Sequence, residues 1–178
     1  SFEPNMGQSA KQVEFLARGK GHTLFLTPSE AVLSLRDCEQ KVNTSVLRMK
    51  PVGANANAEL KGEQPLAGKV NYMIGNDRSN WHTGIPTFRQ VHYIDLWRGI
   101  DMVWYGTQTE LEYDFVLKPG SEASDVRIEF EGAEKLRVDD QGNLIVSSNG
   151  EEVRHLAPVV YQDTKEGRVP VVGNYVIK

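Results

Sequence analysis

The sequence predicts an all-β protein, an antiparallel β-sandwich with few or no helices. The first observation is a period of two, because apolar and polar side chains alternate along many short segments, as they do on half-buried strands. The second is the spacing of Gly, Asn, Asp and Pro turn signals, which recur roughly every 8–12 residues, as in sandwiches and barrels. No segment carries the apolar period of an ordinary helix over the length that a helix needs.

The clearest predicted strand spans residues 110–117. Successive strand side chains point to opposite faces, so Glu110, Glu112 and Asp114 share one face and an apolar row shares the other. The run 126–131 alternates in the same way. The shorter candidate strands are residues 13–18, 22–27, 31–35, 43–49, 58–63, 69–74, 88–93, 101–105, 136–138, 144–147, 151–154, 159–162, 168–172 and 174–178.

Turn signals separate these strands. Asp139–Asn143 and Ser148–Gly150 are typical of short hairpin connections. Helix is limited to one or two turns near residues 29–31, 94–98 and 121–124, the last of which begins at a Ser suited to an N-cap.

A chain of 178 residues is long enough for one domain with a core. We expect a single sandwich-like domain over residues 1–178, with a Pro-Gly break at 118–121 where the chain could divide into two lobes. The chain opens abruptly at Ser1 and stops in a strand-like run, which predicts a fragment of a longer multidomain protein.

Composition argues against several function classes. The chain has 20 Lys and Arg against 24 Asp and Glu, a formal net charge of −4, so the totals give no hint of the basic face that nucleic-acid binding needs. No apolar run approaches the roughly 20 residues of a membrane span. One cysteine, Cys38, excludes an internal disulfide, and the four histidines lack zinc-like spacing. We therefore predict no metal ion, no cofactor and no catalytic residues.

The polar segment 75–87 is the first candidate binding site, because a long polar connection that carries an aromatic residue is often functional. Its candidate ligand-binding residues are Asp77, Arg78, Trp81 and His82. Trp81 could be exposed for a ligand or could pin the loop to the body of the protein. Residues 76–80 could hold calcium, but short polar side chains that bond their own backbone are the commoner arrangement.

The carboxylate row is the second candidate site. Alternate strand residues lie roughly 6.6–6.8 Å apart, a separation that suits the acid and base of an inverting glycosidase. Glu112 and Asp114, with Glu110, are the residues concerned. A solvent-facing strand surface is the simpler interpretation. The aromatic block 88–105 could likewise grip a sugar or peptide, although large aromatics more often anchor a core.

Several blocks of sequence together resemble a known family. They are Phe2–Gln8, Val13–Gly19, Val52–Asn55, Asn71–Trp81, Gly99–Gly106, Leu111–Gly120, Phe130–Gly132 and Pro158–Gln162. In this order they resemble the N-terminal domain of bacterial exported or surface proteins that carry beta-propeller-type (SBBP) repeats, a family of unknown function. The resemblance implies export, an extracellular or cell-surface location and neighbouring domains in the same chain. It supplies no catalytic residues.

We therefore predict a non-catalytic binding, adhesion or structural module of an exported bacterial protein. A glycan and a protein both stay open as the ligand, and the neighbouring domains of the parent chain are expected partners. The first alternative is a carbohydrate-active enzyme that uses the strand carboxylates. The second is a purely structural domain that packs against neighbouring repeats, which predicts an exposed apolar patch near residues 169–177.

Overall fold

A computed structural model describes residues 1–36, 44–106 and 111–178, so Cys38 and Glu110 lie outside the described residues. The chain forms two compact units, Ser1–Glu131 and Gly132–Lys178. Residues 118–121, where the sequence suggested a division, lie within the first unit. Within the described residues, the structure contains no helix long and apolar enough to cross a membrane.

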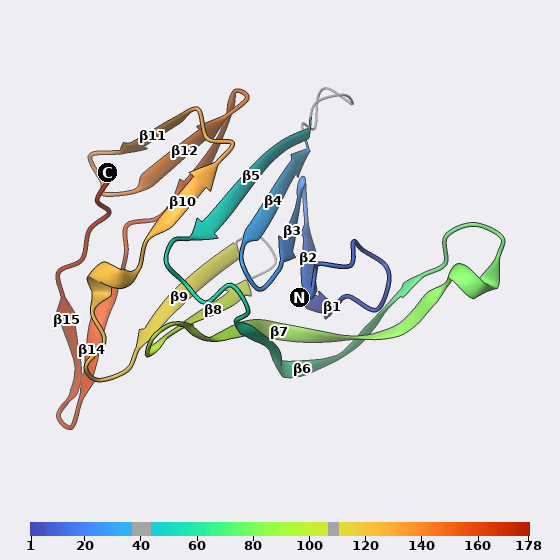
Figure 1. Cartoon of the computed structure of the whole chain (residues 1–178), viewed down its shortest axis with the longest axis horizontal. Coiled ribbons are helices and arrows are strands. Elements are labelled where there is room, and N and C mark those ends of the chain that lie inside the picture. The colour runs from blue at the N-terminus through green and yellow to red at the C-terminus, as the bar shows by residue number, and fades with distance from the viewer. Residues whose placement is uncertain (37–43, 107–110) are drawn as a thin grey trace. The chain divides into compact units, whose positions relative to one another are not determined.

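The first unit is built on one ten-stranded antiparallel sheet, which confirms the predicted all-β class (Figure 1). Hydrogen-bonded neighbours follow the order β10-β5-β4-β3-β2-β1-β7-β8-β9, and β6 pairs with β7. The sheet is continuous and curls into a half-barrel, so the finer prediction of a sandwich is not confirmed. The strands are β1 (Phe2–Pro4), β2 (Phe15–Gly19), β3 (His22–Leu26), β4 (Ala31–Arg36), β5 (Thr44–Pro51), β6 (Glu59–Tyr72), β7 (His82–Trp97), β8 (Ile100–Gly106), β9 (Leu111–Leu117) and β10 (Ile128–Glu131).

The core of the first unit collects the apolar side chains from one face of this curled sheet. Tyr93, Trp97 and Trp104, which the sequence left open as ligand-gripping aromatics, are 2%, 5% and 2% exposed and belong to this core. The Tyr93 hydroxyl donates a hydrogen bond to the Thr27 carbonyl at 3.0 Å. Burying such large aromatic side chains contributes strongly to the stability of a core.

The strands β6 and β7 are the longest of the sheet, and two features of them were not predicted. Residues 82–87, expected in a loop, form the start of β7. Residues 94–98, expected as a helical turn, include the end of β7, where the register with β8 shifts between Tyr93 and Trp97. Asp95 adopts a φ of 46° at this shift, and its backbone N–H donates to Asp101 Oδ1 at 2.8 Å. The expected helical turn is therefore wrong, because a bulge accommodates the extra residues.

The second unit is small and contains two sheets. The first has the order β11-β12-β13 and the second pairs β14 with β15. As the Ser148–Gly150 signal predicts, Asn149 and Gly150 have φ values of 50° and 81° and connect β12 to β13, as in the favoured hairpin turn. Residues 174–178, expected as a strand, form none. The strands are β11 (Lys135–Val138), β12 (Leu144–Ser148), β13 (Glu151–His155), β14 (Val160–Thr164) and β15 (Gly167–Val171).

Candidate functional site

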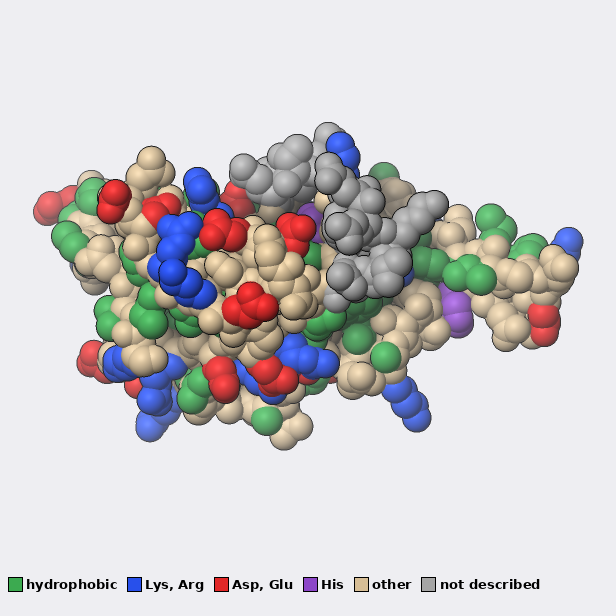
Figure 2. All heavy atoms as spheres, turned by 90° about the horizontal axis from the view of Figure 1, so that it is seen from above, with side chains coloured by type: hydrophobic (Ala, Val, Ile, Leu, Met, Phe, Trp, Pro, Cys, Tyr) green, Lys and Arg blue, Asp and Glu red, His purple; other side chains and the backbone are tan. Residues whose placement is uncertain are grey.

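A hairpin arm extends from the curled sheet of the first unit (Figure 1). The hairpin arm comprises residues 65–88, which are the outer halves of β6 and β7 with the connection between them. Within the arm the two strands pair with each other, and the only further pairing within the described residues joins Phe88 to Phe2 of β1. In Figure 2 hydrophobic side chains emerge among polar ones along this projecting part. A two-stranded ribbon is marginally stable alone, so its attachment to the rest of the unit decides whether it is rigid.

Tyr72 attaches the arm to the first two strands. Its hydroxyl donates a hydrogen bond to Glu3 Oε1 at 2.6 Å and accepts one from Arg18 Nε at 2.9 Å. The Arg18 guanidinium also lies 5.3 Å from the centre of the Tyr72 ring. Burial and the hydrogen bond to Glu3 raise the pKa of Tyr72. Glu3 is only 5% exposed, so its carboxylate is costly to leave without the Tyr72 donor.

Asp77, one of the predicted site residues, orders the tip of the arm. Asp77 accepts hydrogen bonds from Ser79 N at 2.9 Å and Ser79 Oγ at 2.7 Å, and it caps the short 3-10 helix η1 (Arg78–Asn80). These bonds lower the pKa of Asp77. The side chain therefore bonds its own loop, as the Asx-turn interpretation expects. Within the described ranges, no group of three or more His, Cys, Asp and Glu is placed to hold a metal ion.

Trp81 contacts two other residues of the loop at the tip. Its Nε1 donates to the Gly75 carbonyl at 3.1 Å, and the Arg78 guanidinium lies 5.4 Å from the centre of its ring. The structure thus brings Asp77, Arg78 and Trp81 together at the tip. His82 is different, because it is half-buried against the N-terminal loop, where a Cβ added at Gly7 would lie 2.6 Å from its ring.

Two exposed apolar residues at the tip were not singled out from the sequence. Met73 and Ile74 are 61% and 73% exposed and follow directly after Tyr72. Each looks ordinary in the sequence, since an apolar residue in a strand-like run is expected to be buried. Only the projection of the arm leaves them in water.

Glu112 and Asp114 lie on the outer face of β9, opposite the row that packs on the core. Their cross-strand neighbours on β8 are Tyr105 and Val103. Burial and hydrogen bonds to the Asp114 and Glu112 carboxylates raise the pKa of the Tyr105 phenol. Glu112 and Asp114 lie on β9, whereas Asp77, Arg78 and Trp81 lie at the tip of the arm, so the structure places these predicted residues in two separate groups.

An ionic network on the same outer face was missed. The His92 ring lies between two carboxylates, with Nδ1 3.1 Å from Glu63 Oε1 and Nε2 3.2 Å from Asp101 Oδ2. Lys118 Nζ lies 3.2 Å from Asp101 Oδ1 and 2.7 Å from Asp95 Oδ1. These residues come from β6, β7, β8 and the position directly after β9. The sequence carries no signal for their meeting, because the register between strands is not a local property.

The network perturbs the acidity of its members. Hydrogen bonds from His92 and Gln90 lower the pKa of Glu63. Burial, the largest influence on Asp101, raises its pKa, but the hydrogen bonds from Asp95 N, Lys118 and His92 outweigh it and leave that pKa lowered. The paired carboxylates raise the pKa of Lys118. The network therefore favours the ionised forms of Glu63 and Asp101, which is suited to stabilising the sheet.

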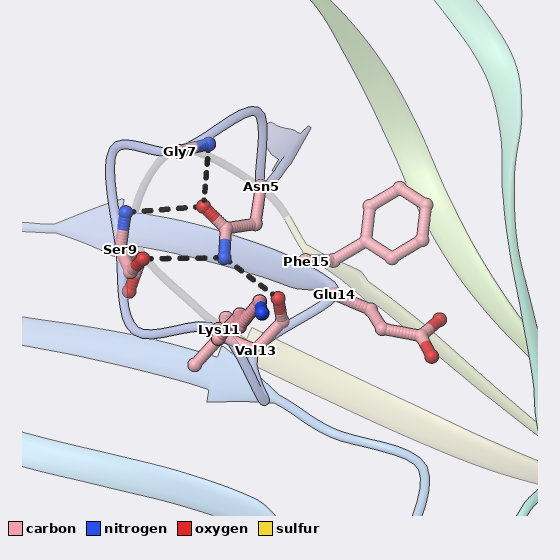
Figure 3. Close-up of a pocket in the computed structure, with 7 residues that line it drawn as sticks. All are labelled: Asn5, Gly7, Ser9, Lys11, Val13, Glu14 and Phe15. Atoms are coloured by element: carbon pink, nitrogen blue, oxygen red, sulfur yellow. Dashed lines mark hydrogen bonds between the residues drawn. The ribbon is translucent and has the colours of Figure 1, made fainter.

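A hollow lies beside the N-terminal loop (Figure 3). Asn5 holds this loop together, because its Nδ2 donates to the Ala10 and Val13 carbonyls, both at 2.8 Å, and its Oδ1 accepts from the backbone of Gly7 and Ser9. The hollow is wide open. It is lined by Asn5, Gly7, Ser9, Lys11, Val13, Glu14 and Phe15. A second, small cavity lies in the core beside Tyr93 and Trp104. None of the six predicted site residues lines either hollow.

The chain matches a protein-family model over almost its whole length. The model of a family described as Domain of unknown function (DUF7948) matches residues 2–178. Neither the curated proteins nor the solved structures include a match. The matched range covers the arm, the acidic face of β9 and the second unit alike. The chain therefore belongs to the family described as Domain of unknown function DUF7948.

Proposed function

We propose that the chain is a non-catalytic binding module that grips a protein ligand with the tip of its hairpin arm. The observation that carries this proposal is the exposure of Met73 and Ile74, 61% and 73%, at the end of an arm fixed to the sheet. Exposed apolar groups of this kind mark interaction sites, and Met is enriched in protein interfaces. A fixed arm also loses little conformational freedom when it binds.

The choice of a protein over a glycan rests on the aromatic residue of the tip. A sugar ring stacks on an open aromatic face. The Arg78 guanidinium lies over the Trp81 ring, and Trp81 Nε1 donates a hydrogen bond to the Gly75 carbonyl. Trp81 thus supports the tip, while the exposed Met73 and Ile74 present a thioether and an aliphatic side chain to a ligand. These are groups that a protein partner buries by the hydrophobic effect.

The carboxylates of β9 support the non-catalytic part of the proposal. A glycosidase holds its acid and base in a cleft that receives the sugar. Glu112 and Asp114 line neither of the two hollows and share the Tyr105 phenol as a neighbour. We also propose, from the resemblance to SBBP-repeat proteins, that the module belongs to an exported bacterial protein and works outside the cell.

The test compares three forms of the whole chain on immobilised bacterial surface proteins and on a panel of polysaccharides. The tip variant is Met73→Ser with Ile74→Ser, and the matched control is Val169→Ser with Val171→Ser, which removes two other exposed apolar side chains. We expect saturable binding to a surface protein that the tip variant loses and the control retains. Retention by the tip variant, or binding to polysaccharide alone, would contradict the proposal.

A second assay addresses the enzyme alternative. The wild-type chain is incubated with the same polysaccharides and the release of reducing sugar is measured, with Glu112→Gln beside it. We expect no release from either form. Release that Glu112→Gln abolishes would establish the glycosidase instead.

A second candidate function is favoured by the second unit, which could serve to pack against a neighbouring domain. Both strands of the pair β14–β15 are exposed along their whole length. Val159, Val172 and Val176 beside them are 88%, 90% and 76% exposed. The exposure of Val172 and Val176 supports the structural interpretation, which predicts an apolar patch near residues 169–177. Amide hydrogen exchange of residues 159–177 tests it, measured in this chain alone and in a form joined to the proposed neighbouring domain, since a docked domain would slow exchange there.

A further inference from the structure

We infer that β9 is a docking edge for an extended segment of a partner protein that carries Lys or Arg at alternate positions with apolar residues between them. The inference does not depend on the tip of the arm. In the sheet order β9 is the last strand, and among the described residues it pairs only with β8. The other edge of β9 therefore presents backbone N–H and C=O groups that a further strand can bind.

The other two edges of the sheet are poorer templates. The edge of β6 is interrupted by Pro65, which has no N–H to donate, and by two register shifts. The edge of β10 is only four residues long. In contrast, β9 pairs with β8 over seven consecutive residues without a shift and contains no proline. Proteins usually protect an edge of this kind by interrupting it, and β9 is not interrupted.

The inner face of β9 is fixed in place, which makes the edge a rigid template. Tyr113 lies 4.9 Å from the ring of Trp104 and 5.7 Å from that of Phe115, and Phe115 lies 5.9 Å from that of Trp97. The three residues Leu111, Tyr113 and Phe115 are partly buried against the core. Apolar side chains of an added strand would extend this row, since neighbours on one face of a sheet pack together.

The outer face of β9 specifies the charge of the added strand. Glu112 and Asp114 stand there, and no ion pair among the described residues neutralises either of them. The acidic residues of β10 differ, because Glu131 pairs with Lys50 and Glu129 lies opposite the same lysine in the register. Cations on an added strand would therefore pair with the carboxylates of β9. Opposite charges directly across two strands are stabilising.

The same carboxylates disfavour a second copy of this chain. Antiparallel pairing of two β9 strands centred on Tyr113 would place Glu112 of one copy opposite Asp114 of the other. Like charges directly across a pair of strands are destabilising. Charge complementarity thus selects a basic partner strand over self-association.

The test measures binding of blocked octapeptides to the whole chain. The probes are an alternating Lys-Val peptide, an alternating Glu-Val peptide, a peptide with the four lysines grouped before the four valines, and the Lys-Val peptide N-methylated at alternate residues on either edge. We expect the alternating Lys-Val peptide to bind at least about tenfold tighter than the other sequences, from two or more cross-strand ion pairs. At least one N-methylated form should lose binding, because strand addition needs the N–H groups of one peptide edge.

Protein variants locate the site. Glu112→Gln with Asp114→Asn should weaken Lys-Val binding about tenfold. The matched control, Glu134→Gln with Asp140→Asn, removes two exposed charges from the second unit. This control should bind the Lys-Val peptide as tightly as the wild type. Bound peptide should also slow amide exchange at alternate residues of 111–117. Equal binding of the grouped peptide, full binding of both N-methylated forms, or equal loss in both variants would overturn the inference in favour of unspecific ionic contact.

Discussion

The Tyr72 hydroxyl donates a 2.6 Å hydrogen bond to Glu3, a residue 69 positions earlier in the chain. This bond joins the outer half of β6 to β1, so it links a two-stranded ribbon to the main body of the sheet. Arg18 completes the contact from β2, with its Nε 3.7 Å from Glu3 Oε1. The rigidity that we assign to the arm depends on these three side chains.

Tyr72→Phe should therefore destabilise the first unit. The variant keeps the ring beside Arg18 but leaves the buried Glu3 carboxylate without its hydroxyl donor, a loss of about 1–3 kcal/mol. Urea unfolding followed by tryptophan fluorescence measures it, because all three tryptophans lie in the first unit. Tyr161→Phe, in the exposed strand β14, is the control and should change the free energy of unfolding by less than about 0.5 kcal/mol. Equal effects of the two variants would show that the contact does not hold the arm.

Trp81→Phe should loosen the tip without lowering the stability of the unit. The change removes the hydrogen bond from Nε1 to the Gly75 carbonyl but keeps an aromatic ring beside Arg78. Local opening of an exposed loop does not require global unfolding. We expect faster amide exchange in residues 75–80 and a change in global unfolding free energy below about 1 kcal/mol. Unchanged exchange at the tip would mean that Asp77 and Ser79 alone order it.

Asp101→Asn should destabilise the first unit at neutral pH but not in acid. The folded-state pKa of Asp101 is lowered, so its ionised form contributes stability above the unfolded pKa, and that stability is lost as pH falls through the folded pKa. We expect a cost of about 1–3 kcal/mol at pH 7, which shrinks below a pH of about 4. Urea unfolding at several pH values measures both. Asp125→Asn, at an exposed position in η2 (Ala123–Asp125), is the control and should change the free energy of unfolding at pH 7 by less than about 0.5 kcal/mol.

The second unit should lose stability in mild acid through His155. Burial lowers the pKa of His155 to about 4, so the neutral ring is the form that the fold favours. Its contribution is complete above the unfolded pKa of about 6.5 and is lost as pH falls from there toward 4. At most about 3 kcal/mol is involved, at about 1.4 kcal/mol for each pKa unit.

Amide exchange in β12 at pH 7 and pH 5 reports on this unit without interference from the first. We expect exchange, corrected for its intrinsic pH dependence, to show weaker protection of residues 144–148 at pH 5. His155→Phe should remove the difference between the two pH values. A persistent difference in that variant would assign the acid sensitivity to other groups.

The period-two pattern by itself determined the class of the protein and the two faces of its strands. On β9 it correctly separates the row of Leu111, Tyr113 and Phe115, which packs on the core, from Glu112 and Asp114 on the outer face. It also located the hairpin turn at Asn149 and Gly150. These are local properties, because side-chain direction alternates within one strand and a tight turn depends on the φ angles of two residues.

Only the tertiary structure decided which strands pair and in which register. The half-barrel order, the bulge at Asp95, the short strand β1, the meeting of His92 with Glu63 and Asp101, and the contact of Tyr72 with Glu3 all join residues from different strands. The same alternation suits a sandwich as well as a curled sheet. The choice depends on how the strands pack around a shared core, which is a property of the whole first unit and of no single segment.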